Sequence, residues 1–183
     1  MVFKLRDIVY LVIATTVTAL DLFTKYLIQK KFELYQIVQV IGDTLRIFYI
    51  RNTGFTFGLL SRKDGQPSEL DKFMPYILVG LSLAALTAVF FLYINISRML
   101  KGKIPQILGR ISMMFVVGGA LGNIIDRLLH GAVTDFIDFG IGEWRWYTFN
   151  VADSFVVVGG IALVILFAFF EYKAEKNEGK STD

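Results

Sequence analysis

Residues 118–154 decide how this chain is organised, and they read GGALGNIIDRLLHGAVTDFIDFGIGEWRWYTFNVADS. The stretch lies between two strongly apolar segments, 111–117 and 155–170, yet it contains five carboxylates: Asp126, Asp135, Asp138, Glu143 and Asp153. An ionised side chain at bilayer depth is costly, so acids at a membrane edge indicate a functional site. We therefore expect some of these acids to form a site and the others to lie in polar connections.

The composition indicates an integral membrane protein. The 183 residues are 55% hydrophobic and include 17 Phe, whereas soluble domains have about 45 to 50% on a comparable count. Cys is absent and the only His is His130, which argues against disulfides, Cys nucleophiles and zinc sites built on His or Cys. A metal bound by carboxylates alone stays open, but we expect no metal and no cofactor. The basic residues flank the apolar segments, as membrane anchors do, so nucleic acid is not an expected partner.

Four apolar segments are long enough to cross a hydrocarbon core of about 30 Å. We predict transmembrane helices at residues 8–28, 73–96, 111–129 and 151–170. The first lacks a cleavage site of small residues and carries Asp21 and Lys25 in its last turns, so it is not expected to be a signal peptide. Small residues in the third favour close helix packing, at Gly118, Gly119, Ala120 and Gly122.

The segments outside the helices are predicted to be a small sheet and a tail. Residues 36–41 and 44–51 are rich in β-branched and aromatic residues and are separated by Gly42-Asp43, which predicts two strands and a turn. We place this β-region at about 31–72, where it must lean on the membrane surface or the helix ends. Residues 61–71 and the strands before them are predicted to form a mobile cover at the outer membrane face. The tail 171–183 mixes Glu and Lys and is predicted to be disordered. The fold class is thus a single membrane-embedded domain over 1–183, all-α with a small β element.

Four crossings bring several polar residues to one membrane face. Lys and Arg are concentrated between the second and third helices, which by the positive-inside rule places both termini in the cytoplasm. The opposite, outer face then carries Asp21, Asn52, Asn123, Arg127, Asp135, Asn150 and Asp153. Polar residues that share one interface can build one site.

Each of these residues also has a structural interpretation. Asp21 and Lys25 are spaced i, i+4 and can simply pair with each other. Asn150 and Asp153 match an N-cap with an acid three residues later. Arg127 fits a cation at a helix end; Asn123 shares its face, and Asp126 points to a different face.

The remaining candidates are expected to be structural. His130 beside Gly131 fits a helix C-terminus better than a catalyst, and one His gives no basis for a Ser-His-Asp triad. Asp138 and Glu143 are most simply solvated loop acids.

At these positions the sequence resembles the lipoprotein signal peptidase (signal peptidase II) family of membrane-embedded aspartic proteases, over about 8–170. Five ordered motifs carry the resemblance: Asp21 followed by Lys25, Arg51-Asn-Thr-Gly with Phe57-Gly58, Gly119-Ala-Leu-Gly-Asn-Ile-Ile-Asp-Arg127, Val133-Thr-Asp-Phe136, and Phe149-Asn-Val-Ala-Asp-Ser154. The resemblance implies that Asp135 and Asp153 are the catalytic pair. The polar residues around them would be Asp21, Lys25, Asn52, Gly54, Asn123, Arg127 and Asn150. Phe55 and Thr56 replace the small residues usual in the family, which would alter the substrate groove.

The resemblance also implies the partners and the location. The substrates would be prolipoproteins with a lipid-modified Cys, and the enzyme would be a monomer among the lipids of a bacterial cytoplasmic (inner) membrane, with its active site near the outer face. Two close carboxyls that share a proton can supply both the base and the acid for amide hydrolysis. Asp153, at a helix start, would be the ionised member and Asp135 the proton carrier.

Two other functions fit parts of the sequence. A small proton- or ion-coupled carrier would use Asp21, Asp126 and Asp135 as relay acids. Inverted repeats would favour a carrier, and we find none between the two halves. A structural membrane subunit would leave the paired acids unexplained.

Overall fold

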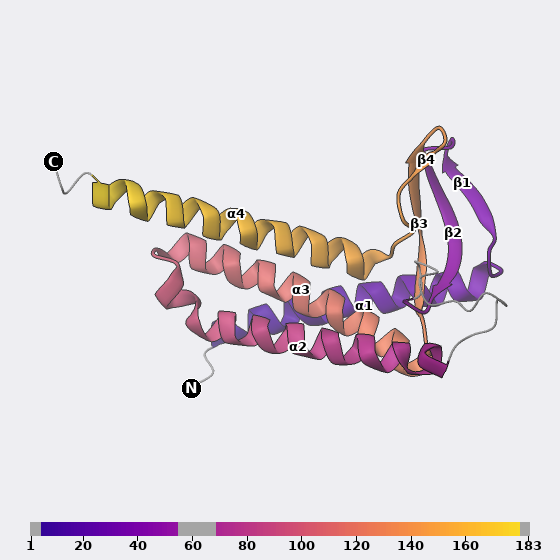
Figure 1. Ribbon diagram of the computed structural model, residues 1–183, viewed down its shortest axis with the longest axis horizontal. Coiled ribbons are helices and arrows are strands. Elements are labelled where there is room, and N and C mark those ends of the chain that lie inside the picture. Colours follow the sequence, from indigo (N-terminus) through magenta and orange to yellow (C-terminus); the bar gives the residue numbers. More distant parts are fainter. Residues whose placement is uncertain (1–4, 55–68, 180–183) are drawn as a thin grey trace.

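The computed structural model describes residues 5–54 and 69–179. Its long helices are α1 (Leu5–Lys31), α2 (Glu69–Met99), α3 (Lys103–His130) and α4 (Val151–Gly179). Each contains a segment long and apolar enough to cross a membrane. The four helices run side by side, and a small sheet stands across one end of them, while α1 begins and α4 ends at the opposite end (Figure 1). The predicted fold class, four long apolar helices with a small β element, is therefore confirmed.

The helices extend beyond their apolar segments. The second helix was predicted to end too early, at 96, and the third to begin too late, at 111, because α2 runs to Met99 and α3 already begins at Lys103. Arg110 consequently lies inside a helix, buried, with its guanidinium 4.5 Å from the centre of the Tyr93 ring. That cation–π contact and a 3.3 Å hydrogen bond to Ser97 Oγ offset the cost of burying the charge.

The backbone of α4 is helical to Gly179, which corrects the predicted disorder from residue 171. The residues after Phe170 include Glu, Lys and Ala, which have high helix propensity. A helix that has already been nucleated gains one hydrogen bond for each residue added, so these turns continue α4 without a new nucleation cost.

Helix α3 is the centre of the bundle and packs against α1, α2 and α4. At Gly118 and Gly119 an added Cβ would lie 2.6 Å from the Ala14 carbonyl oxygen and 2.5 Å from the Ala152 carbonyl oxygen, respectively. The small residues of α3 therefore let it approach the backbones of α1 and α4 closely, as the sequence predicted.

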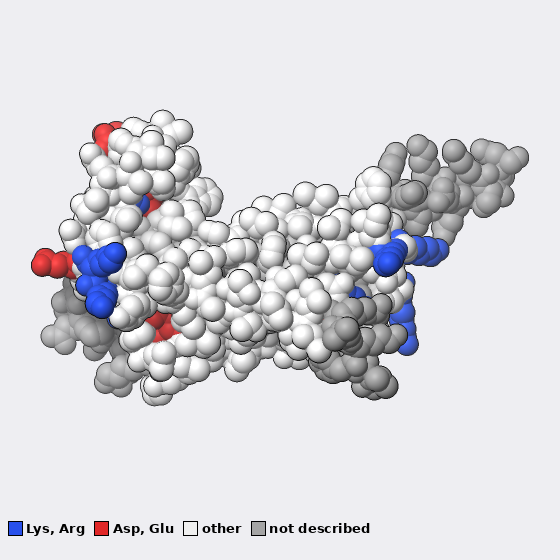
Figure 2. Space-filling view, turned by 180° about the vertical axis from the view of Figure 1, so that it is seen from behind, with Lys and Arg blue, Asp and Glu red and all other residues white. Residues whose placement is uncertain are grey.

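The surface of the bundle suits a lipid environment. Many large apolar side chains are exposed along the helices, among them Leu11, Phe90, Ile161 and Val164. On the face shown in Figure 2, charged side chains gather towards the two ends and leave the middle of the bundle uncharged. This distribution is typical of a protein that spans a bilayer.

The sheet has two strands that the sequence predicted and two that it did not. Strands β1 (Ile37–Ile41) and β2 (Leu45–Asn52) match the predicted pair. Strands β3 (Val133–Ile141) and β4 (Trp144–Arg145) come from the connection between α3 and α4 and complete an antiparallel sheet of order β1-β2-β3-β4. The β-region is therefore not confined to residues 31–72.

The sheet is tied to the helix ends, so it can position residues there. Tyr49 of β2 and Phe136 of β3 pack against Ile28 of α1 in a buried apolar cluster. At the end of α3, Gly131 adopts the left-handed conformation with φ 71° and turns the chain into β3. Antiparallel pairing then sets Asp135 opposite Ile50 of β2.

The loop of the predicted cover, residues 61–71, falls almost wholly outside the described residues. Phe55, Thr56, Phe57 and Gly58 lie outside them, as do residues 61–68. Residues 69–71, which were expected to belong to the cover, begin α2.

Candidate active site

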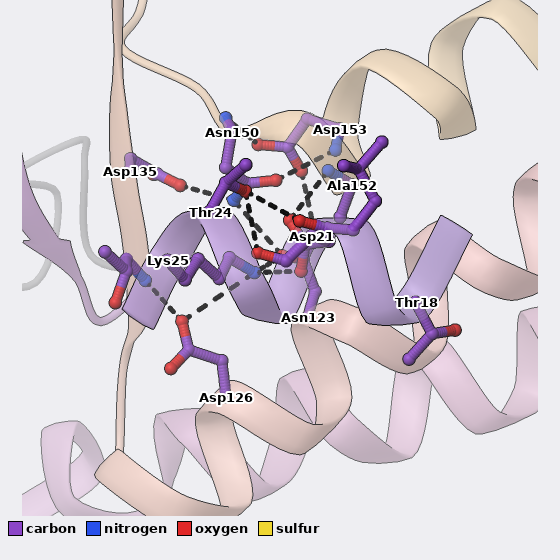
Figure 3. A network of polar contacts seen from close by, with 12 residues as sticks. Thr18, Asp21, Thr24, Lys25, Asn123, Asp126, Asp135, Asn150, Ala152 and Asp153 are labelled. Carbon is purple, nitrogen blue, oxygen red and sulfur yellow. Dashed lines mark hydrogen bonds and ion pairs between the residues drawn. The ribbon is translucent and has the colours of Figure 1, made fainter. Parts of the chain in front are cut away.

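Polar residues from α1, α3, β3 and the start of α4 meet where the sheet crosses the ends of the helices (Figure 3). Asp135 extends from β3, Asp153 lies in the first turn of α4, and Asn150 is drawn between them. Asp21 and Lys25 come from α1 and Asn123 from α3. The structure thus brings together residues that the sequence placed at one membrane face.

Asp135 is buried and is held by two asparagine amides. Asn52 Nδ2 donates to Asp135 Oδ2 at 2.8 Å, and Asn150 Nδ2 donates to Oδ1 at 2.6 Å. The oxygen of Asn52 accepts the Gly54 amide at 2.8 Å. Since that oxygen is occupied by a donor, the Asn52 side chain must present its NH2 group to Asp135.

Gly54 is required for this arrangement. Its φ of 86° lies in the left-handed region, which an L side chain rarely adopts. A Cβ there would also lie 2.1 Å from Leu78 Cδ1 of α2. Gly54 therefore supports the site by shaping the turn that orients Asn52.

Asp153 and Asn150 form a reciprocal cap at the start of α4. The Asp153 amide donates to Asn150 Oδ1 at 2.9 Å, and the Asn150 amide donates to Asp153 Oδ2 at 3.2 Å. The structural interpretation as an N-cap is thus correct, but the same Asn150 also contacts Asp135. One capping residue therefore fixes the relative position of the two acids.

Asn123 and Lys25 complete the surroundings of Asp153. Asn123 Nδ2 donates to Asp153 Oδ1 at 2.8 Å, while Lys25 Nζ donates to Asn123 Oδ1 at 2.7 Å. Lys25 Nζ also lies 2.8 Å from Asp21 Oδ2, and Asp21 Oδ1 accepts the Ala152 amide at 2.9 Å. The i, i+4 pair of α1 is therefore present, and in addition it orients an amide of the site and holds the start of α4.

The two central acids have neutral partners. In residues 5–54 and 69–179, no Lys, Arg or His forms an ion pair with Asp135 or Asp153. Burial raises the pKa of Asp135 to about 7, and the negative charge of Asp153 acts in the same direction, while the hydrogen bonds from Asn52 and Asn150 lower it. Asp135 is therefore close to half protonated near neutral pH, beside a second carboxyl.

Arg127 lies near these acids, and one of its hydrogen-bond donors has no partner among the described residues. Its guanidinium interacts electrostatically with Asp153, Asp135 and Asp126. Its Nε is buried and has no hydrogen-bond partner among the described residues. A buried donor without a partner costs free energy, and a hydrogen bond from this nitrogen to a bound molecule would remove that cost.

The prediction that Asp126 points away from the site is wrong. Its buried Oδ2 accepts the Thr134 amide at 2.6 Å and lies 3.7 Å from Lys25 Nζ. The i, i+3 spacing from Asn123 could have revealed this, because residues three apart share a helix face. His130 ends α3, as predicted, and its Nδ1 lies 2.7 Å from Asp126 Oδ1.

Asp138 is not a solvated loop acid. It is 2% exposed in β3 and lies between two arginines, with Arg46 Nε 2.8 Å from Oδ2 and Arg145 Nε 3.1 Å from Oδ1. Glu143, in contrast, is exposed in the turn before β4, as expected.

A family model described as signal peptidase (SPase) II matches residues 13–170. The chain is 37% identical over 167 residues to a lipoprotein signal peptidase of Escherichia coli O157:H7, covering 91% of this chain and 93% of that protein. It is 38% identical to a lipoprotein signal peptidase of Shigella flexneri over the same shares.

Solved structures of bacterial membrane enzymes share the fold of this chain. One bacterial membrane enzyme superposes with a TM-score of 0.70 at 29% identity, covering 86% of this chain and 90% of that chain. A second gives a TM-score of 0.71 at 28% identity, covering 92% and 91%. With its four helices, its paired aspartates and a match over most of its length, the chain belongs to the signal peptidase II family.

Proposed function

We propose that the protein is a membrane-embedded aspartic endopeptidase that removes signal peptides from prolipoproteins carrying a lipid-modified Cys. The observation that carries this proposal is the pair Asp135 and Asp153, joined through Asn150 and, among the described residues, hydrogen-bonded only by neutral amides. Neutral donors orient both carboxyls, and burial raises the pKa of Asp135. Two nearby carboxyls of this kind can supply the acid and the base that amide hydrolysis needs.

The reaction divides the work between the two acids. Asp153 accepts hydrogen bonds from Asn123 Nδ2 and the Asn150 amide and lies in the first turn of α4, where the helix dipole favours a negative charge. As the ionised member it takes a proton from water, whose oxygen attacks the scissile carbonyl carbon. Asp135, whose pKa is raised to about 7, carries the proton that is delivered to the leaving amine. The products are a free carboxyl and a free amine.

The surrounding residues bind and orient. The unpartnered Nε of Arg127 is a donor for a carbonyl oxygen of the substrate backbone. Asn52, Asn123 and Asn150 hold the carboxyls, and Lys25, Asp21 and Gly54 hold those amides. No metal and no cofactor enters these steps.

The location of the site fits a substrate that arrives through the bilayer. The signal peptide of a prolipoprotein is itself a membrane helix, so the enzyme must act at the depth where that helix ends. The sheet end of the bundle, with its polar site, is then the outer face of the bacterial inner membrane, and both termini are cytoplasmic. We expect a monomer surrounded by lipid. A carrier is not favoured, because the family match covers residues 13–170, which include parts of all four helices.

The test is cleavage by the purified protein in detergent or liposomes. A prolipoprotein peptide with a diacylglyceryl-modified Cys should be cut just before that Cys, and the same peptide without lipid should be cut far more slowly. Cleavage should persist with chelators and thiol reagents. Loss of cleavage with a chelator, restored by a divalent cation, would instead favour a metal held by these acids. Equal cleavage of both peptides would contradict the proposed substrate.

A further inference from the structure

Asp126 is a buried acid that the proposed reaction does not use. It lies in the penultimate turn of α3 and is 2% exposed. Charged or titratable groups reach it from three elements: Lys25 of α1 at 3.7 Å, Arg51 of β2 at 4.0 Å and His130 of α3 at 2.7 Å. An acid so enclosed costs free energy to bury, which raises the question of what its position achieves.

The first effect of Asp126 is on the strand that carries Asp135. Its Oδ2 accepts the backbone amide of Thr134, the residue immediately before Asp135, at 2.6 Å. A backbone hydrogen bond fixes the chain itself, so it limits where Asp135 can lie. The Thr134 side chain is held as well, because Gln29 Nε2 of α1 donates to its Oγ1 at 2.8 Å. The start of β3 is thus anchored to α3 and α1 together.

The second effect of Asp126 is on the amide that contacts Asp153. Lys25 is 1% exposed within a membrane-spanning segment, so its charge needs nearby acids. Asp21 and Asp126 provide them, and Lys25 lies between these two acids in Figure 3. Held there, Lys25 donates to Asn123 Oδ1, which leaves Asn123 Nδ2 to face Asp153.

We infer that Asp126 is a positioning residue for both acids of the active site, acting on Asp135 through the Thr134 amide and on Asp153 through Lys25 and Asn123. The inference depends on the proposed protease function but is separate from it, since Asp126 touches neither of the reacting carboxyls. Its two roles can be separated because one depends on where the carboxylate lies and the other also depends on its charge.

Two substitutions probe these roles separately. Asp126→Asn keeps the shape and an acceptor for the Thr134 amide but removes the charge that faces Lys25. Asp126→Glu keeps the charge but displaces the carboxyl by one methylene. The matched control is Glu143→Gln, which removes one acid from an exposed turn. Each variant is purified, and kcat, KM and the pH profile are measured on the lipidated peptide and corrected for folded protein.

Both Asp126 variants should lower kcat about tenfold to hundredfold with KM changed less than threefold, because small misplacements of reacting groups cost that much. The basic limb of the pH profile should move to lower pH in Asp126→Asn, since Lys25, whose charge lowers the pKa of Asp135, loses one of its counter-charges, and should stay in place in Asp126→Glu. The double variant Asp126→Asn with Asn123→Ala should lose less activity than the product of the single losses, because the two residues act along one path.

A residue with a merely structural role would behave differently. It would lower the yield or the unfolding temperature, while kcat per folded molecule and the pH profile stayed at the wild-type values. That result in either folded variant would overturn the inference. If Asp126→Asn is recovered only unfolded, Asp126→Glu decides by the same criterion. The proposed function is tested separately by Asp135→Asn, so an inactive Asp135→Asn with a normal Asp126→Glu refutes the positioning role alone.

Discussion

Asp135 and Asp138 lie three residues apart on the same strand, are almost completely buried, and have opposite kinds of partners. Asp135 is 1% exposed and, within residues 5–54 and 69–179, accepts hydrogen bonds only from the asparagine amides of Asn52 and Asn150. Asp138 is 2% exposed and lies against two guanidinium groups, with Arg46 NH2 at 2.6 Å and Arg145 NH2 at 2.8 Å from its Oδ2. Because successive strand residues point to opposite faces, the two acids leave β3 on opposite sides.

The difference teaches how a buried acid can be assigned to chemistry or to structure. Two arginines stabilise the charged form of Asp138 and join neighbouring strands, since Arg46 is its direct partner in β2 and Arg145 lies in β4. Neutral amides hydrogen-bond to Asp135, and burial raises its pKa to about 7, although the charge of Lys25 acts to lower it. Burial alone does not distinguish the two acids, whereas the charge of their partners does.

The largest expected effect separates the two acids directly. Asp135→Asn and Asp153→Asn should each reduce kcat by about 10³-fold or more, because each removes one of two required proton sites. Asp138→Asn should keep kcat per folded molecule within about threefold. Turnover of the lipidated peptide by purified, folded protein checks all three. Near-normal turnover by either Asp135→Asn or Asp153→Asn would refute the assignment of the pair.

The next prediction tests whether the distance between α3 and α4 controls the positions of Asp135 and Asp153. At Gly119 a Cβ would meet the Ala152 carbonyl oxygen at 2.5 Å, so Gly119→Ala must separate α3, which carries Asn123, from α4, which carries Asp153. We expect kcat to fall about tenfold to hundredfold. Gly160→Ala is the control, because nothing lies within 4 Å of a Cβ at that position of α4. Equal kinetics of the two variants would show that the site tolerates a wider α3–α4 distance.

The pH profile should depend on the partners of Asp135 and not on those of Asp138. The reaction needs Asp135 protonated, so kcat/KM should fall about tenfold per pH unit above its pKa of about 7. Asn52 stabilises the ionised form by donating to Asp135 Oδ2, so Asn52→Ala should raise that pKa and move the basic limb to higher pH while lowering the maximum. Arg46→Gln should leave the limb in place. A shift to lower pH in Asn52→Ala would contradict the assignment of Asp135 as the proton carrier.

The sequence predicted the parts of this comparison that local patterns determine. Long apolar segments identified the helices, and the strand signal with Gly42-Asp43 identified β1 and β2. The five motifs identified Asp135, Asp153 and their asparagine partners, which the structure brings together. The pairing of Asp21 with Lys25 followed from their i, i+4 spacing.

The parts that were missed depend on contacts between distant segments. Strand β3 pairs with β2 across more than eighty residues of sequence, as in the hydrogen bond from Asn52 to Asp135, and no local pattern shows such a partner. With β3 read as a loop, Asp138 appeared solvated, although its arginines lie 92 residues before it and 7 after it. The start of α3 was placed too late because polar residues such as Arg110 were assumed to lie outside a helix, whereas contacts with α2 hold Arg110 inside α3.

A smaller effect on activity, but a clear one on stability, is expected at Asp138. Asp138→Asn leaves Arg46 and Arg145 without their counter-charge, and both side chains are partly exposed, at 24% and 21%. Water therefore compensates in part, and we expect a loss of about 1 to 3 kcal/mol instead of the larger cost of a fully buried pair. This loss in the free energy of unfolding is measured by thermal unfolding in detergent, with circular dichroism as the readout. Asp138→Asn with Arg46→Gln should lose less than the sum of the two single variants, and strict additivity would show that the ion pairs contribute nothing.

The smallest effect is expected at Glu143, the remaining acid of the stretch between α3 and α4. Glu143 is exposed in the turn that contains Gly142 with φ 59° and lies two residues before Arg145. Arg145 instead contacts Asp138 and the carbonyl oxygen of Asp43. Glu143 forms no ion pair with any residue that the structure describes. Glu143→Gln should therefore change the free energy of unfolding by less than about 0.5 kcal/mol and leave kcat and KM unchanged. A destabilisation as large as that of Asp138→Asn would mean that the net charge of this hairpin, and not the buried contacts of Asp138, holds the sheet in place.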